Sequence, residues 1–200
     1  MNDHNIQLIE EAERIRQELL DLGWYAGIDV AKVGIQGAMR ATELVNRLAE
    51  LGDEIIPESK DAADMKVHCL LEGATRGSGD EGVIDKLVAM GFDALNPILN
   101  LIMDRNENSF RRRVSIVALS QLKLEKVDPE TAAIPLIQVL RNPWGDDFKV
   151  LVMAIRAVGD MGARNAINAL EEFPLEVFPE GSFEADTLAN ERTQAIAKLK

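Results

Sequence analysis

The stretch FKVLVMAIRAVGDMG, residues 148–162, decides the fold. Its β-branched and aromatic side chains favour a strand, but its polar residues do not alternate with apolar ones. Lys149, Arg156 and Asp160 are spaced seven and four residues apart, which is the spacing of one helix face. The run is also too long for a typical buried strand, and Gly162 can end a helix. The sequence therefore predicts a largely buried helix here.

Helical patterns continue through the rest of the chain. Helices are expected at 3–22, 29–51, 61–75, 82–90, 93–103, 109–123, 130–141, 146–160, 163–173 and 184–200. Clusters of Gly, Pro, Asn and Asp separate these segments, as in turns. Alternating apolar and polar residues do not occur over a useful length, so essentially no sheet is expected.

Pairs of these helices recur at a regular interval. Pro97 and Pro135 lie 38 residues apart, and RRRVSIVALSQL (111–122) matches VLVMAIRAVGDM (150–161) at an offset of 39. Alanines of two successive first helices recur after 33 residues. A period of 33 to 39 residues with two helices per unit is typical of an α-solenoid, in which each helical pair covers the apolar face of its neighbour.

The segment AIPLIQVLRNPWGDDFKVLVMAIRAVGDMGARNAINALEEF (133–173) resembles the HEAT-like repeats of phycobilisome lyases and of many bacterial repeat proteins. Ile134 and Pro135 stand where the first helix of such a unit often carries Ile-Pro, and Gly159 matches a small position of the second helix. The resemblance covers about residues 83–173. It implies an all-α protein, a right-handed α-α superhelix of the HEAT/armadillo-like solenoid type.

The helices outside the resemblance suggest two parts. Residues 1–60 are expected to form an N-terminal helical extension packed on the array. Residues 61–200 are expected to form the HEAT-like repeat array, whose last helix would pair with the helix at 163–173 and cap it.

The composition of the chain narrows the classes of partner and the location that we expect. A formal net charge of -12 repels nucleic-acid phosphates and anionic membranes, so neither partner is expected, although an acidic surface can also serve solubility alone. With a single cysteine, Cys69, no internal disulfide is possible, which fits a cytoplasmic location. The N-terminus lacks the basic and then apolar run of a secretory signal, and no apolar window is long enough to span a membrane.

Three motifs invite a chemical interpretation, and each is better explained without one. GSGDEG (77–82) has the G-x-G-x-x-G spacing, but no strand precedes it. DRNENS (104–109) begins like a calcium loop but has Ser115 in place of the bidentate Glu. His68 and Cys69 are neighbours on a helix and point about 100° apart, so they are poorly placed as a base and nucleophile. Acidic pairs fit a solvated surface, and no metal site, cofactor or catalytic residue is predicted.

A local excess of basic residues is the strongest binding signal. Residues 104–126 hold six Lys or Arg against three Asp or Glu. If the second helices of successive units line the concave surface, a basic strip with a tryptophan at its rim would face an acidic partner. The predicted partner-binding residues are Arg112, Arg113, Lys149, Arg156 and Trp144. The alternative is that these arginines offset neighbouring acids or satisfy the carbonyls at helix ends.

The sequence favours a non-catalytic scaffold that binds a protein or peptide through a curved surface, and it leaves enzymatic activity and oligomeric state open. The resemblance allows two alternatives. The first is a phycobilisome-lyase-like subunit that handles a bilin, which an absorption shift on mixing with a bilin would reveal. The second, which the net charge disfavours, is a HEAT-like DNA-binding protein, and a salt-dependent gel shift would test it.

Overall fold

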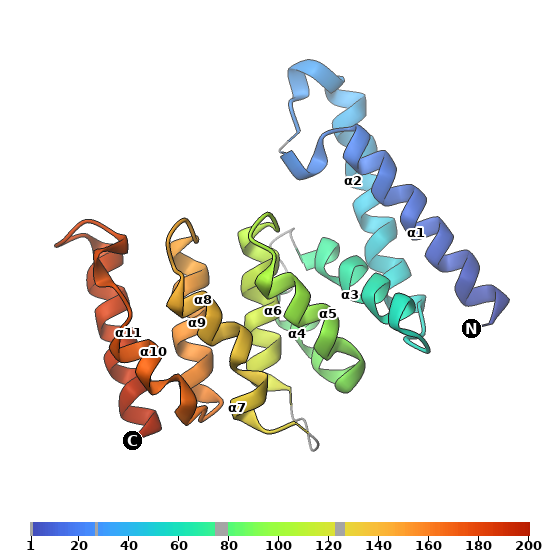
Figure 1. The fold of residues 1–200 in the computed structure, drawn as a ribbon. Coiled ribbons are helices and arrows are strands. Elements are labelled where there is room, and N and C mark those ends of the chain that lie inside the picture. The colour runs from blue at the N-terminus through green and yellow to red at the C-terminus, as the bar shows by residue number, and fades with distance from the viewer. Residues whose placement is uncertain (1, 27, 75–79, 123–126) are drawn as a thin grey trace. The chain divides into compact units, whose positions relative to one another are not determined.

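A computed structural model describes residues 2–26, 28–74, 80–122 and 127–200 (Figure 1). Within those residues every regular element is a helix and no strand occurs, so the all-α prediction is confirmed. The chain divides into two compact units, Met1–Pro97 and Ile98–Lys200, which we describe separately. The predicted boundary at residue 61, between an N-terminal extension and a repeat array, is not the boundary between these compact units, and it stays a prediction.

Unit 1 is built from long helices that follow the predicted segments closely. Its elements are α1 (Asp3–Asp21), the 3-10 turn η1 (Trp24–Ala26), α2 (Val30–Glu54), α3 (Lys60–Ala74), α4 (Asp80–Ala89) and the first half of α5 (Phe92–Met103). α2 packs against α3 and α1. Gly52 allows the closest approach between α2 and α3, because a Cβ atom there would lie 2.9 Å from the backbone nitrogen of Leu70.

The core of unit 1 uses the apolar stripe that the sequence indicated for α1, with Leu8, Ala12, Ile15 and Leu19 all buried. α2 behaves differently along its length. Its buried side chains begin at Ala41, and the helix is interrupted at Gly34, which has φ 74° and ψ 172°.

Unit 2 consists of shorter helices. Its elements after α5 are α6 (Ser109–Gln121), α7 (Pro129–Ala132), α8 (Ile134–Arg141), α9 (Phe148–Asp160), η2 (Arg164–Ala166), α10 (Ile167–Glu171), η3 (Leu175–Val177) and α11 (Phe183–Leu199). The helix predicted over 130–141 is divided into α7 and α8. Pro135 explains the division, because it has no N–H to donate to the carbonyl of Thr131.

The stretch at 148–162 is the buried helix that its polar spacing predicted. Eight of the 13 residues of α9 are buried. Asp147 caps the start by accepting a hydrogen bond from the backbone N–H of Lys149 at 2.9 Å, and Gly162 follows the end with φ 70°. Tertiary packing therefore outweighs the strand preference of the β-branched residues.

α9 packs against both α6 and α11, and in Figure 1 these three helices stand side by side. α8 packs on α9 and α10 packs on α11, so unit 2 contains successive helical pairs. Gly159 of α9 lets α11 approach closely, since a Cβ atom there would lie 3.1 Å from the Cα of Ala195. The last helix therefore covers α9 as well as the predicted partner, α10.

Candidate functional site

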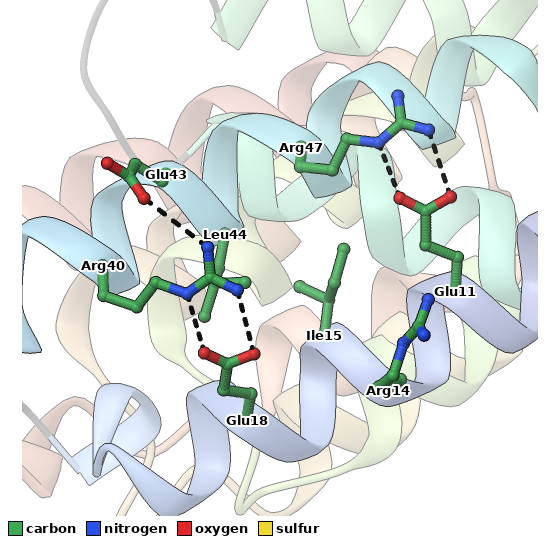
Figure 2. Close-up of a pocket in the computed structure, with 8 residues that line it drawn as sticks. All are labelled: Glu11, Arg14, Ile15, Glu18, Arg40, Glu43, Leu44 and Arg47. Carbon is green, nitrogen blue, oxygen red and sulfur yellow. Dashed lines mark hydrogen bonds and ion pairs between the residues drawn. The ribbon is translucent and has the colours of Figure 1, made fainter.

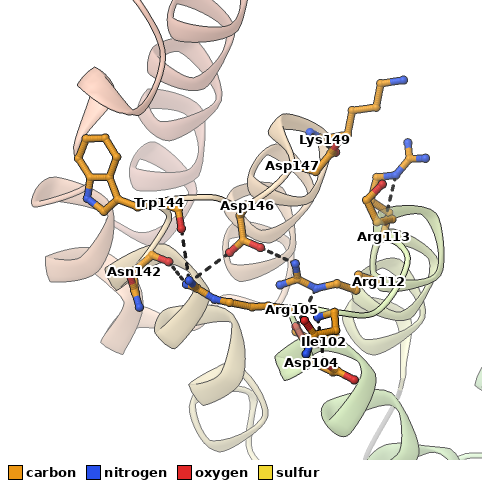
Figure 3. A network of polar contacts seen from close by, with 12 residues as sticks. Ile102, Asp104, Arg105, Arg112, Arg113, Asn142, Trp144, Asp146, Asp147 and Lys149 are labelled. Carbon is orange, nitrogen blue, oxygen red and sulfur yellow. Dashed lines mark hydrogen bonds and ion pairs between the residues drawn. The ribbon is translucent and has the colours of Figure 1, made fainter. Parts of the chain in front are cut away.

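The predicted basic strip contains one residue that the structure places in the interior. The side chains of Arg112 and Asp146 are only 3% and 2% exposed. Arg112 donates through Nε to the carbonyl of Ile102 at 3.1 Å and through Nη1 to the Asp146 carboxylate (Figure 3). Arg112 therefore satisfies a buried acid and a carbonyl at the end of α5, which is the alternative that the sequence left open.

Arg105 completes this arrangement from the turn before α6. Its guanidinium donates to the backbone carbonyls of Asn142 and Trp144, the latter at 3.3 Å, and its Nη2 lies 3.7 Å from the second oxygen of Asp146. We name Arg105, Arg112 and Asp146 the clamp, in which Arg112 and Asp146 are buried and Arg105 is 45% exposed. The clamp joins the end of α5 and the start of α6 to the loop that leads into α9.

Arg113 is half-buried and Lys149 is exposed, and in Figure 3 both side chains point to the same side, away from the clamp. They belong to α6 and α9, which pack against each other. The Arg113 guanidinium lies 5.4 Å from the centroid of the Phe110 ring, and its Nε donates to the carbonyl of Ser109 at 3.3 Å. Lys149 is exposed, and none of the described residues forms an ion pair or hydrogen bond with its ammonium group. We name Arg113 and Lys149 the cationic pair.

The two remaining predicted residues are Arg156, which already forms an ion pair, and Trp144, which lies apart from the cationic pair. Arg156 lies two turns after Lys149 on α9, but its guanidinium holds Glu191 of α11, with Nε 2.8 Å from Oε2. Hydrogen bonding within this ion pair raises the pKa of Arg156 and lowers the pKa of Glu191. Trp144 is 54% exposed, and Figure 3 shows it on the other side of Asp146 from Lys149.

Sequence reasoning missed the aromatic residues beside the cationic pair. Phe110, Phe148 and Phe183 each stand in the first turn of a second helix, α6, α9 or α11. The Phe148 and Phe183 ring centroids are 6.1 Å apart, and Phe183 is 74% exposed. Their intervals of 38 and 35 residues match the repeat period, which was the available signal.

Unit 1 contains a polar groove of about 500 Å³ between α1 and α2, shown in Figure 2. It is lined by Glu11, Arg14, Ile15, Glu18, Arg40, Glu43, Leu44 and Arg47. Arg40 binds Glu18 at 2.8 and 3.2 Å, and Arg47 binds Glu11 at 2.8 and 3.1 Å. These hydrogen bonds lower the pKa values of both glutamates, which disfavours a role as proton donors near neutral pH.

The other motifs keep structural roles where the structure describes them. The thiol of Cys69 is fully buried in unit 1. The turn at 104–109 is closed by Asp104, whose carboxylate accepts a hydrogen bond from the backbone N–H of Asn106 at 2.9 Å. Residues 77–79 of the glycine-rich motif lie outside the described residues. Nowhere in the described part of the chain do three His, Cys, Asp or Glu side chains gather closely enough to hold a metal ion.

Comparisons of this chain with family models, with curated proteins and with solved structures gave no match. No single helix in the described ranges has the length and apolar character needed to cross a membrane, and one bent pair, Gly82–Met90 with Phe92–Met103, passes that test jointly by length and composition.

Proposed function

We propose that the chain is a HEAT-like repeat scaffold, with its helical pairs arranged as a right-handed superhelix, that binds an acidic segment of a partner protein or peptide. The observation that carries the proposal is the cationic pair: half-buried Arg113 and exposed Lys149 belong to packed neighbouring helices, and their side chains point to the same side in Figure 3. The spacing of contacts between elements of unit 2 supports the repeat. Arg112 meets Asp146 after 34 residues, and Arg156 meets Glu191 after 35.

The cationic pair is suited to select a carboxylate. Lys149 has no ion-pair partner among the described residues, so a bound acid would not first have to displace one. Arg113 is held against Phe110, and a side chain that is already ordered loses less entropy on binding. In a chain of net charge -12, a local positive surface directs an acidic partner to one place rather than many.

The aromatic side chains add an apolar component. Phe183 is exposed at the start of α11 and touches Phe148, the neighbour of Lys149 in the sequence. A partner that carries a hydrophobic residue beside its acidic ones could contact both kinds of group. Aromatic anchors surrounded by charges are typical of protein interfaces.

The test is capture of partners by the wild-type protein and by the double variant Arg113→Glu/Lys149→Glu, compared in parallel with quantitative mass spectrometry. Arg141→Glu is the matched control, because Arg141 is an exposed cation at the end of α8 in the same unit. We expect the double variant to lose its specific partners, with affinity reduced by about 10-fold or more, and the control to keep them. Equal capture by all three proteins would refute the role of the cationic pair.

A further inference from the structure

The first eleven residues of α2, on both sides of the interruption at Gly34, contribute no fully buried side chain, and only Val33, Gly37 and Ala38 are half-buried. None of the side chains from Val30 to Arg40 is buried, although the segment contains several large apolar residues. Ile35 is 74% exposed and Met39 is 60% exposed, and their spacing of four places them on one helix face. A helix face of this kind normally packs against another element.

The local sequence does little to stabilise this helix on its own. Gly34 interrupts its dihedral angles, and Gly37 adds a second residue of low helix propensity. The segment is held by the Asp29 cap at 3.0 Å, by contact of the Gly37 position with Leu22 of the adjoining turn, and by the ion pair of Arg40 with Glu18. These contacts orient the helix along α1 but leave its apolar face uncovered.

Further exposed apolar residues lie in the same hairpin. Leu20 at the end of α1, Tyr25 in η1 and Val30 at the start of α2 are 56%, 41% and 49% exposed. We name Leu20, Tyr25, Val30, Ile35 and Met39 the apolar tip. Summed over these five side chains, the exposed area is on the order of 500 Å², which is within the range of the largest apolar patch on a typical monomer, and such patches are often functional.

We propose that the apolar tip is the contact through which two copies of the chain associate. Charge favours a second copy at this place. Every copy carries a net charge of -12, so most faces of two chains repel each other, whereas residues 20–39 contain only Asp21, Asp29 and Lys32 as charged groups. An apolar surface is also complementary to itself, as a two-fold axis requires.

The area fits a weak dimer. Two apolar tips would bury on the order of 1,000 Å² in total, which is near the lower limit for a specific interface. An interface near this limit is typical of weak, transient association, so we expect the monomer and the dimer to interconvert as the concentration changes.

Sedimentation velocity of the full chain from roughly 1 to 300 µM tests this proposal, since that range brackets the affinity of such an interface. We expect the mass to rise from 22.1 kDa toward twice that value. Ile35→Glu/Met39→Glu places like charges across the contact and should weaken dimerisation by about 100-fold or more. Phe92→Glu, at a 58% exposed residue of α5, should leave it unchanged.

Circular dichroism establishes whether each variant is folded. If the double variant is unfolded, Ile35→Glu alone, at the most exposed position of the apolar tip, replaces it in the experiment. A wild-type mass that stays monomeric over the whole range overturns the proposal, as does a dimer that persists in the Ile35 variants. Binding to vesicles of neutral phosphatidylcholine tests the main alternative role of the apolar tip, which is contact with a lipid surface. A monomer that binds these vesicles would assign the tip to a lipid surface and refute self-association.

Discussion

Removal of the charge from Asp146 should destabilise unit 2 severely. In Asp146→Asn the side chain keeps its size, but the guanidinium of Arg112 stays 97% buried without its counter-ion. The carbonyl of Ile102 remains as its acceptor, and Arg105 adds a second positive charge on the other side of the same position. Loss of one partner from a buried ion pair costs about 3–5 kcal/mol, because the remaining charge is desolvated and unpaired.

The magnitude is large relative to the stability of a unit of this size. A domain of 60–100 residues loses about 4–8 °C in Tm for each kcal/mol, so a cost of about 3 kcal/mol lowers the Tm by roughly 12–24 °C. Calorimetry and chemical denaturation followed by circular dichroism would measure the change. Where the two units unfold in separate transitions, the transition of unit 2 should move more than that of unit 1.

A matched control and a double variant make the reasoning refutable. Asp160 pairs with Lys198 at the surface, where both side chains are 52% exposed, so Asp160→Ala should cost no more than about 1 kcal/mol. Arg112→Met/Asp146→Ala removes both buried charges and should recover most of the stability that Asp146→Asn loses. If Asp146→Asn costs less than about 1 kcal/mol, or if the double variant is as unstable as the single one, the clamp is not the buried ion pair described.

Two further predictions concern the contact between α9 and α11. Hydrogen bonding from Arg156 holds the pKa of Glu191 below its ordinary value of 4.5, so the pairing stabilises the fold above about pH 4.5 and is lost as the pH falls through the lower pKa of the folded state. Arg156→Met should flatten this pH dependence of the unfolding free energy, measured by denaturant titration at several pH values; an unchanged slope would contradict it. Gly159→Ala should cost about 1–3 kcal/mol, because the new methyl group would meet the backbone of Ala195 at 3.1 Å. Gly82→Ala, where nothing lies within 4 Å of the added methyl group, should instead stabilise its helix by about 0.5–1 kcal/mol. The same denaturation experiment measures the loss of stability in Gly159→Ala and the gain in Gly82→Ala.

The helices could be predicted because their evidence is local. In residues 148–162 the polar spacing excluded a strand, and Asp147 and Gly162 supplied the chemistry of the two helix ends. The sequence also indicates that the helix predicted at 130–141 is interrupted, because Pro135 lacks the backbone N–H that a residue inside a helix donates.

The burial of Arg112 was harder to predict, because the sequence alone does not show whether an arginine side chain is exposed or buried. The predicted repeat held the missing signal. At the offset of 39 residues, Arg112 corresponds to Leu151, and Leu151 is fully buried in α9. A charged residue at a core position of its repeat implies a buried partner, but the sequence does not say which of several nearby acids it is. Only the loop geometry selects Asp146.

The clamp and the cationic pair are parts of one arrangement. Arg112 and Arg113 are adjacent on α6, and Asp146 precedes Lys149 by three residues, so the buried pair joins the same two segments that carry the cationic pair. α6 and α9 also pack directly against each other, so this joint helps to fix their separation. The interior charges therefore set the distance between Arg113 and Lys149. Under the proposed function, recognition of an acidic partner would depend on that fixed distance as much as on the charges, since a preorganised surface loses less entropy when it binds.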